Sequence, residues 1–69
     1  MIGVFKTNIG TPEARQTLIQ ALSTSFHVSN CHVDLEDCDK VLRIADLEVA
    51  EQEIVAFVRE QGFMCDILE

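Results

Sequence analysis

The stretch Asn8–Leu22, NIGTPEARQTLIQAL, contains the change from strand to helix on which the fold prediction depends. Before it, residues 2–8 are rich in branched and aromatic side chains and lead to a glycine, which is typical of a strand followed by a turn. Within it, Thr11 can accept hydrogen bonds from the free amides of a new helix, and Pro12 fits the first helical position because no N–H is needed there. The sequence therefore predicts a strand over 2–8 and a helix over 12–25.

One face of this helix is apolar enough to be packed against a core. Its small and apolar residues recur at steps of three and four, which is the helical period. The positions concerned are Ala14, Leu18, Ala21, Leu22 and Ser25.

After the helix the period of the pattern changes to two. From residue 27 to 36, one face is expected to carry Cys31, Val33 and Leu35, and the other His32, Asp34 and Glu36. Residues 37–40, DCDK, are polar enough for a hairpin turn, and residues 41–45 alternate again with Leu42 and Ile44 facing inward. The sequence thus predicts two antiparallel neighbouring strands.

The last third of the chain repeats the helix-then-strand pattern. A helix over 50–61 is indicated by the spacing of Ile54, Phe57, Val58 and Gln61, and Gly62 ends it as a left-handed residue does. A strand over 63–68 follows, with Cys65 and Ile67 on one face.

The predicted order is β-α-β-β-α-β, without linker, repeat or low-complexity segment. Two right-handed β-α-β crossovers that interleave give an α+β, ferredoxin-like sandwich. In it, both helices cover one face of an antiparallel sheet of order 4-1-3-2. We expect a single domain over residues 1–69, with the loop after the first strand, the 37–40 turn and the loop after the second helix at one end.

The composition narrows the possible partners and compartments. The 69 residues are 48% hydrophobic, and the 12 acidic against 5 basic residues give a net charge of −7, which repels nucleic acids and anionic membrane surfaces. No apolar run is long enough to span a membrane, and MIGVFKTN has no features of a secretory leader. A cytoplasmic protein is expected. Three cysteines cannot all pair, so free thiols are expected too.

Several short sequence features in the two predicted helices occur together at the spacing found in one protein family. Ala21-Leu22, with Leu18 four residues before Leu22, sets the register of the first helix, and Ile54 and Val58 precede Gly62-Phe63 at the end of the second. In these features the chain resembles, over its whole length, the heavy-metal-associated domain of small copper and zinc chaperones and of metal-pumping ATPases.

The resemblance fails at the residues that bind metal in that family. The family's Met-x-Cys-x-x-Cys loop falls on Ile9, Thr11 and Ala14, so the methionine and both cysteines are absent. Thiolates are the donors that compete for Cu(I) or Zn(II), and neither a hydroxyl nor a methyl group replaces them. Metal transfer therefore cannot be carried over from the family.

Cys38 is the candidate for a displaced metal site, because it lies in the 37–40 turn between Asp37 and Asp39. Such a site would bind Cu(I) or Zn(II) with atypical ligands, drawing on Cys65 or His32. A single thiolate makes a poor cage, however, and neighbouring carboxylates raise the pKa of a thiol. Cys31 and Cys65 are interpreted as small apolar fillers on opposite edge strands, too far apart for a disulfide. His27 and His32 are expected on opposite faces.

The sheet face away from the helices is expected to carry an apolar patch. Its predicted members are Ile2, Val4, Val41, Met64 and Leu68, rimmed by Lys6, Arg43, Asp34 and Asp66. A patch of this kind indicates a contact with another protein or with a second copy, although isolated surface hydrophobic residues are ordinary.

The main functional hypothesis is a non-enzymatic domain that has lost its metal loop and acts by protein contact or as a homodimer, without a cofactor. No serine, histidine and acid are arranged for catalysis. The metal-binding alternative through Cys38 stays open. So does an amino-acid-sensing domain of the ACT type, in which Asn8-Ile9-Gly10 would form the ligand site.

Overall fold

The predicted order of elements is confirmed. The computed structural model describes residues 2–26, 28 and 30–68. Along the chain these form β1 (Gly3–Thr7), α1 (Pro12–Phe26), β2 (Asn30–Val33), β3 (Leu42–Ala45), α2 (Glu51–Glu60) and β4 (Cys65–Ile67). The fold is α+β and ferredoxin-like, and no helix in the described part of the chain is both long and apolar enough to cross a membrane.

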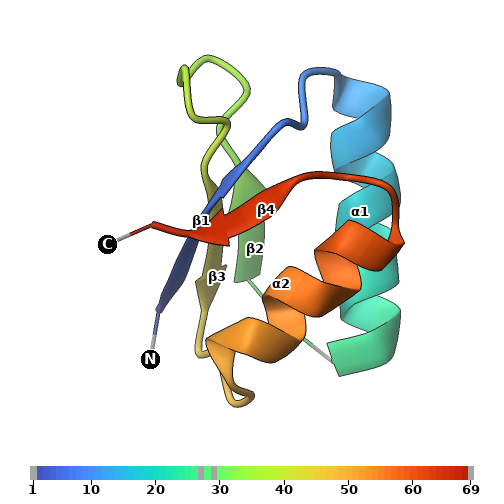
Figure 1. Cartoon of the computed structure of the whole chain (residues 1–69). Helices are drawn as coiled ribbons and strands as arrows, with labels where there is room; N and C mark the ends of the chain where they lie inside the picture. The colour runs from blue at the N-terminus through green and yellow to red at the C-terminus, as the bar shows by residue number, and fades with distance from the viewer. Residues whose placement is uncertain (1, 27, 29, 69) are drawn as a thin grey trace.

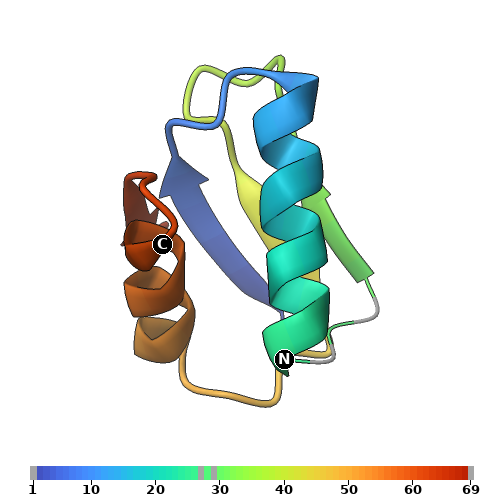
Figure 2. The same cartoon turned by 90° about the vertical axis from the view of Figure 1, so that its right-hand side faces the viewer.

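The described strands form one antiparallel sheet in the order β2-β3-β1-β4, the predicted order seen from the other edge. Both helices lie on the same side of it, to the right of the sheet in Figure 1 and in front of it in Figure 2. The opposite side, which we call the open face, is covered by no helix.

Strand register decides which residues share the open face. In the central row His32 pairs with Arg43, Arg43 pairs with Val4, and the amide of Leu68 donates to the carbonyl of Val4 at 2.9 Å. In the next row Lys6 pairs with Asp66. Alternation places Phe5 and Leu42 on the other side, beneath the helices.

The core lies between the sheet and the helices. Its side chains are at most 5% exposed and come from every element, namely Phe5, Ile9, Leu18, Leu22, Val33, Leu42, Ile44, Leu47, Ile54, Val58 and Cys65. Gly3 leaves room for two of them, because a Cβ there would lie 2.8 Å from both Leu47 Cδ2 and Phe5 Cε2. The absence of a side chain at Gly3 thus leaves space for the side chains of Phe5 and Leu47 beside the start of β1.

The helix ends follow the predicted signals. The Thr11 hydroxyl accepts a hydrogen bond from the Ala14 amide at 3.1 Å. Gly62 has φ +94°, and the amides of Gly62 and Phe63 donate to the carbonyls of Arg59 and Val58 at 3.0 and 3.4 Å. These two bonds form the Schellman arrangement that glycine favours after a helix.

Two helix positions differ from the prediction. Ser25 and Gln61 were expected on the packed faces but are exposed. Phe26 closes the stripe of α1 instead, and its ring meets that of Phe57 edge-on with centroids 5.1 Å apart. An aromatic ring one residue later reaches the second helix, whereas a serine hydroxyl gains nothing from burial there.

The strands are shorter than predicted, most clearly β2. Residues 34–41 form a long turn, since Asp34 and Asp37 accept hydrogen bonds from the amides of Glu36 and Asp39 at 3.0 and 2.8 Å. Aspartate side chains that bind the backbone two residues on compete with strand pairing and bend the chain. Leu35 still packs on the core, as expected. His27, in the predicted strand, lies outside the described residues.

Candidate functional site

The loop where the resembling family binds metal has structural roles in this chain. Ile9 is fully buried in the core, Thr11 caps α1, and the methyl group of Ala14 packs against the core. Asn8, part of the ACT-type expectation, accepts a hydrogen bond from the Met64 amide at 2.9 Å through its side-chain oxygen. The side chains of this loop are therefore engaged in holding the fold.

Thr7 joins this loop to the 34–41 turn. Its amide donates to the carbonyl of Asp39 at 3.0 Å, and its hydroxyl donates to the carbonyl of Lys40. The same hydroxyl accepts a bond from the Ile9 amide at 3.3 Å. With the contact between Asn8 and Met64, these bonds bring the three predicted connections to one end of the molecule.

The importance of Thr7 was missed in the sequence. Its signal is a polar residue at the last inward position of a strand whose other inward residues are Gly3 and Phe5. Because a buried hydroxyl needs a hydrogen-bond partner, such a position indicates a nearby backbone group to be satisfied.

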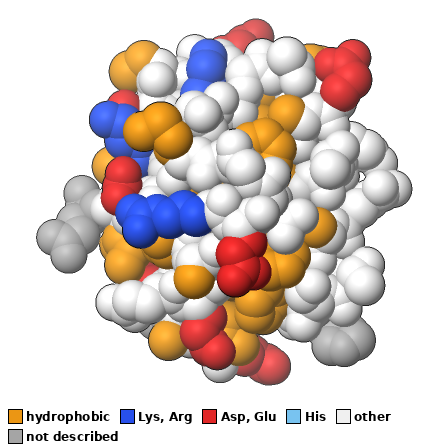
Figure 3. Space-filling model, turned by 45° about the vertical axis from the view of Figure 1, so that its right-hand side comes forward, with side chains coloured by type: hydrophobic (Ala, Val, Ile, Leu, Met, Phe, Trp, Pro, Cys, Tyr) orange, Lys and Arg blue, Asp and Glu red, His pale blue; other side chains and the backbone are white. Residues whose placement is uncertain are grey.

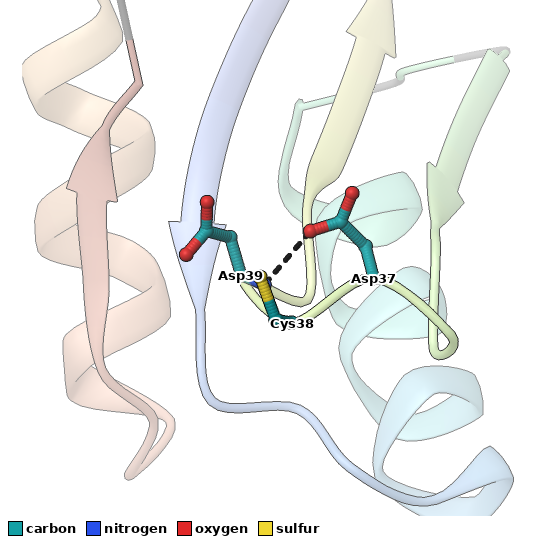
Figure 4. A group of neighbouring side chains, drawn as sticks. All are labelled: Asp37, Cys38 and Asp39. Atoms are coloured by element: carbon teal, nitrogen blue, oxygen red, sulfur yellow. Dashed lines mark hydrogen bonds between the residues drawn. The ribbon is translucent and has the colours of Figure 1, made fainter.

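The turn brings Cys38 together with two carboxylates (Figure 4). The potential ligand atoms of Asp37, Cys38 and Asp39 all lie within 4.8 Å of one another, and the three side chains point to the same side of the turn. Cys38 is exposed and the aspartates are half-buried. One Asp37 oxygen is bound to the Asp39 amide, and Asp39 Oδ1 lies 3.6 Å from Lys6 Nζ. Both carboxylates thus already have partners that hold the turn.

The other expected ligands are not brought to Cys38. Among the described residues, neither Cys65 nor His32 belongs to the group at the turn. Burial raises the pKa of the Cys31 and Cys65 thiols to about 11, so both remain protonated near neutral pH. A protonated thiol is a poor metal ligand. All three cysteines are free, with Cys31 and Cys65 on opposite edge strands.

The open face carries the most exposed hydrophobic side chains. Ile2 is 65% and Met64 64% exposed, and they are the exposed large hydrophobic residues of the described chain. Val4 and Leu68, which are paired through their backbones, are half-buried, and the paired Lys6 and Asp66 separate them from Met64. Val41 was expected in the patch but is only 5% exposed, although it is not part of the core cluster. At this exposure it offers almost no contact surface.

The described surface also has two shallow depressions. One, of about 370 Å³, runs between α2 and β4 past Val55, Arg59 and Asp66. The other, of about 270 Å³, lies on the open face at Ile2, His32 and Arg43. Figure 3 shows the helix side, where hydrophobic side chains are interspersed with charges of both signs and much of the surface is uncharged. Neither depression encloses a ligand-sized space beside a group of reactive side chains.

After comparison with known proteins, the chain can be classified only by its fold. No family model, curated protein or solved structure matches the chain. The β-α-β-β-α-β fold is compatible with a domain like the heavy-metal-associated domains.

Proposed function

We propose that this domain works without catalysis, by binding a protein through its open face. One observation carries the proposal: Ile2 and Met64 are the two exposed large hydrophobic residues of the described chain, and the alternation of β1 and β4, continued by one residue, assigns both to that face. Alternation along β1 and β4 puts Val4 and Leu68 on the same side. Exposed hydrophobic residues are common singly, but their gathering on one uncovered face is typical of an interaction site.

The energetic argument for contact is direct. Burying one large aliphatic side chain contributes about 1.5–3 kcal/mol, so covering Ile2 and Met64 would contribute roughly twice that. The helix side offers less, because the apolar faces of both helices are already packed on the core. A partner that covers the open face would bury the largest remaining apolar side chains of the described surface.

The open face can be tested by capture of partners from an extract of the source cells. Immobilised domain carrying Met64→Asp is expected to retain at least about tenfold less of any specific partner, because a carboxylate would be buried without a counter-charge. The control is Ala56→Asp, which adds the same charge at an exposed position of α2. Equal retention by both variants would contradict the proposal.

A second candidate function is cation binding at the 34–41 turn. It is favoured by the convergence of Asp37, Cys38 and Asp39, whose ligand atoms lie within 4.8 Å of one another. One thiolate with two carboxylates suits a borderline ion such as Zn(II) better than Cu(I), which prefers several sulfur ligands. Solvent would have to supply the remaining ligands, so binding would be weaker than in a closed cysteine site.

The cation candidate has its own test. The reduced protein would be titrated anaerobically with Zn(II) and with Cu(I) against a chelator of known affinity, beside Cys38→Ser. This candidate requires Zn(II) binding that falls at least about tenfold in the variant, because the lost thiolate is its softest ligand. Binding that is unchanged in Cys38→Ser, or no binding beyond that of a free thiol, would remove it.

A further inference from the structure

The open face differs from the rest of the molecule in charge. Among the described residues, alternation puts Lys6 and Arg43 of the central strands and Asp66 of β4 on this face, and Asp34, directly after β2, continues the alternation of that strand. Their ion-pair partners at the rim are Asp39, 3.6 Å from Lys6, and Arg59, 2.9 Å from Asp66. Counting described residues only, the face and its rim therefore hold three positive and three negative side chains, in a chain whose net charge is −7.

The excess of negative charge lies elsewhere. Helix α2 and the residues leading into it carry Glu48, Glu51, Glu53 and Glu60, and the 34–41 turn carries Glu36 and Asp37. A basic partner would be drawn to these regions by long-range attraction. The balanced charges of the open face give it no comparable long-range attraction for a basic partner.

We infer that the partner of the open face is a second copy of this chain, an inference that rests on the proposed function. Two copies approach with like net charge, so only a locally neutral surface can be brought together without strong repulsion. Face-to-face packing around a two-fold axis would bring Ile2, Val4, Met64 and Leu68 of each copy into a shared apolar layer. The result is a four-layer assembly with the helices outside.

The size of the face sets the strength of such a dimer. A stable interface usually covers about 800 Å² on each partner, which would be roughly a fifth of the 4310 Å² surface of the described chain. We therefore expect a dimer that dissociates on dilution in the micromolar range.

Sedimentation of the whole chain at two ionic strengths tests this inference. Between about 10 μM and 1 mM, the mass is expected to rise from monomer to dimer, and association should strengthen several-fold from 0.05 to about 0.5 M salt. Salt screens the repulsion between the acidic surfaces that lie outside the open face of each copy, and it does not weaken the apolar contact.

The variants Val4→Asp and Met64→Asp should stay monomeric. The control is Val55→Asp, at a half-buried valine on α2, which should still dimerise. Circular dichroism verifies that each variant is folded.

The outcomes separate this inference from the proposal on which it rests. If the wild-type chain is monomeric at 1 mM at both salt concentrations, the inference that the partner is a second copy is overturned. If Met64→Asp still abolishes capture of another protein, the proposed contact function stands with a different partner. If neither dimerisation nor a capture that depends on Met64 is found, both the inference and the proposed function are overturned. Association that weakens with salt, or that Val55→Asp abolishes while Met64→Asp does not, places the contact on another surface and also overturns the inference.

Discussion

Replacing Phe5 by alanine is expected to lower the free energy of unfolding by about 3–5 kcal/mol. Phe5 is fully buried at the centre of the fold, on β1 between β3 and β4. Removal of its ring leaves a cavity that the strand cannot close, since β1 is held by pairing on both sides. A domain of this size is stabilised by only about 3–10 kcal/mol in total, so the variant should be largely unfolded at moderate temperature.

Urea unfolding followed by circular dichroism measures this effect. The matched control is Phe57→Ala, because Phe57 is only half-buried and meets Phe26 at the edge of the core. Its loss should cost about half as much or less, since solvent already reaches the ring. If the two variants were equally destabilised, the core would not be centred beneath β1.

Replacing Thr7 by valine is the second large expected effect, with a loss of about 1–3 kcal/mol. The substitution keeps the shape and β-branching of the side chain and removes only the hydroxyl. That hydroxyl donates to the carbonyl of Lys40 and accepts from the amide of Ile9. The variant leaves both backbone groups without their partner in a place with little access for water.

The effect should be local as well as global. Hydrogen exchange of the Ile9 amide, which loses its acceptor, is expected to accelerate in Thr7→Val. Thr17→Val is the control, because its hydroxyl donates to the Glu13 carbonyl within an exposed helical turn and should cost less than about 0.5 kcal/mol. Unchanged exchange at Ile9 in Thr7→Val would mean that the hydroxyl does not hold the two loops together.

The fold was predictable from the sequence because its strongest signals are local. Thr11 before Pro12 begins a helix for reasons of hydrogen bonding within one turn, and Gly62 ends one because its backbone can be left-handed. The alternation of Leu42 and Ile44 needs only the two-residue period of a strand. These effects act within a few residues, so no knowledge of distant contacts was required.

The details that were predicted wrongly depend on neighbours that are distant in sequence or on competing local bonds. Val41 was predicted to be part of the exposed patch, but it is only 5% exposed. Ser25 has the right spacing for the packed stripe, yet the ring of Phe26 reaches Phe57 and closes the stripe instead. At the candidate site, sequence indicated that Cys38 lies between two carboxylates. It did not indicate that Lys6 and Thr7 of β1 would hold that turn.

The distribution of the three thiols makes the turn a natural labelling point. Cys38 is exposed, whereas burial raises the pKa of Cys31 and Cys65 to about 11. Only the thiolate reacts with maleimides, and roughly one in a thousand molecules of a thiol with that pKa is ionised at pH 8. A fluorophore or spin label would therefore attach to the native sequence preferentially at Cys38. Distances within an assembly could then be measured without first removing or adding a cysteine.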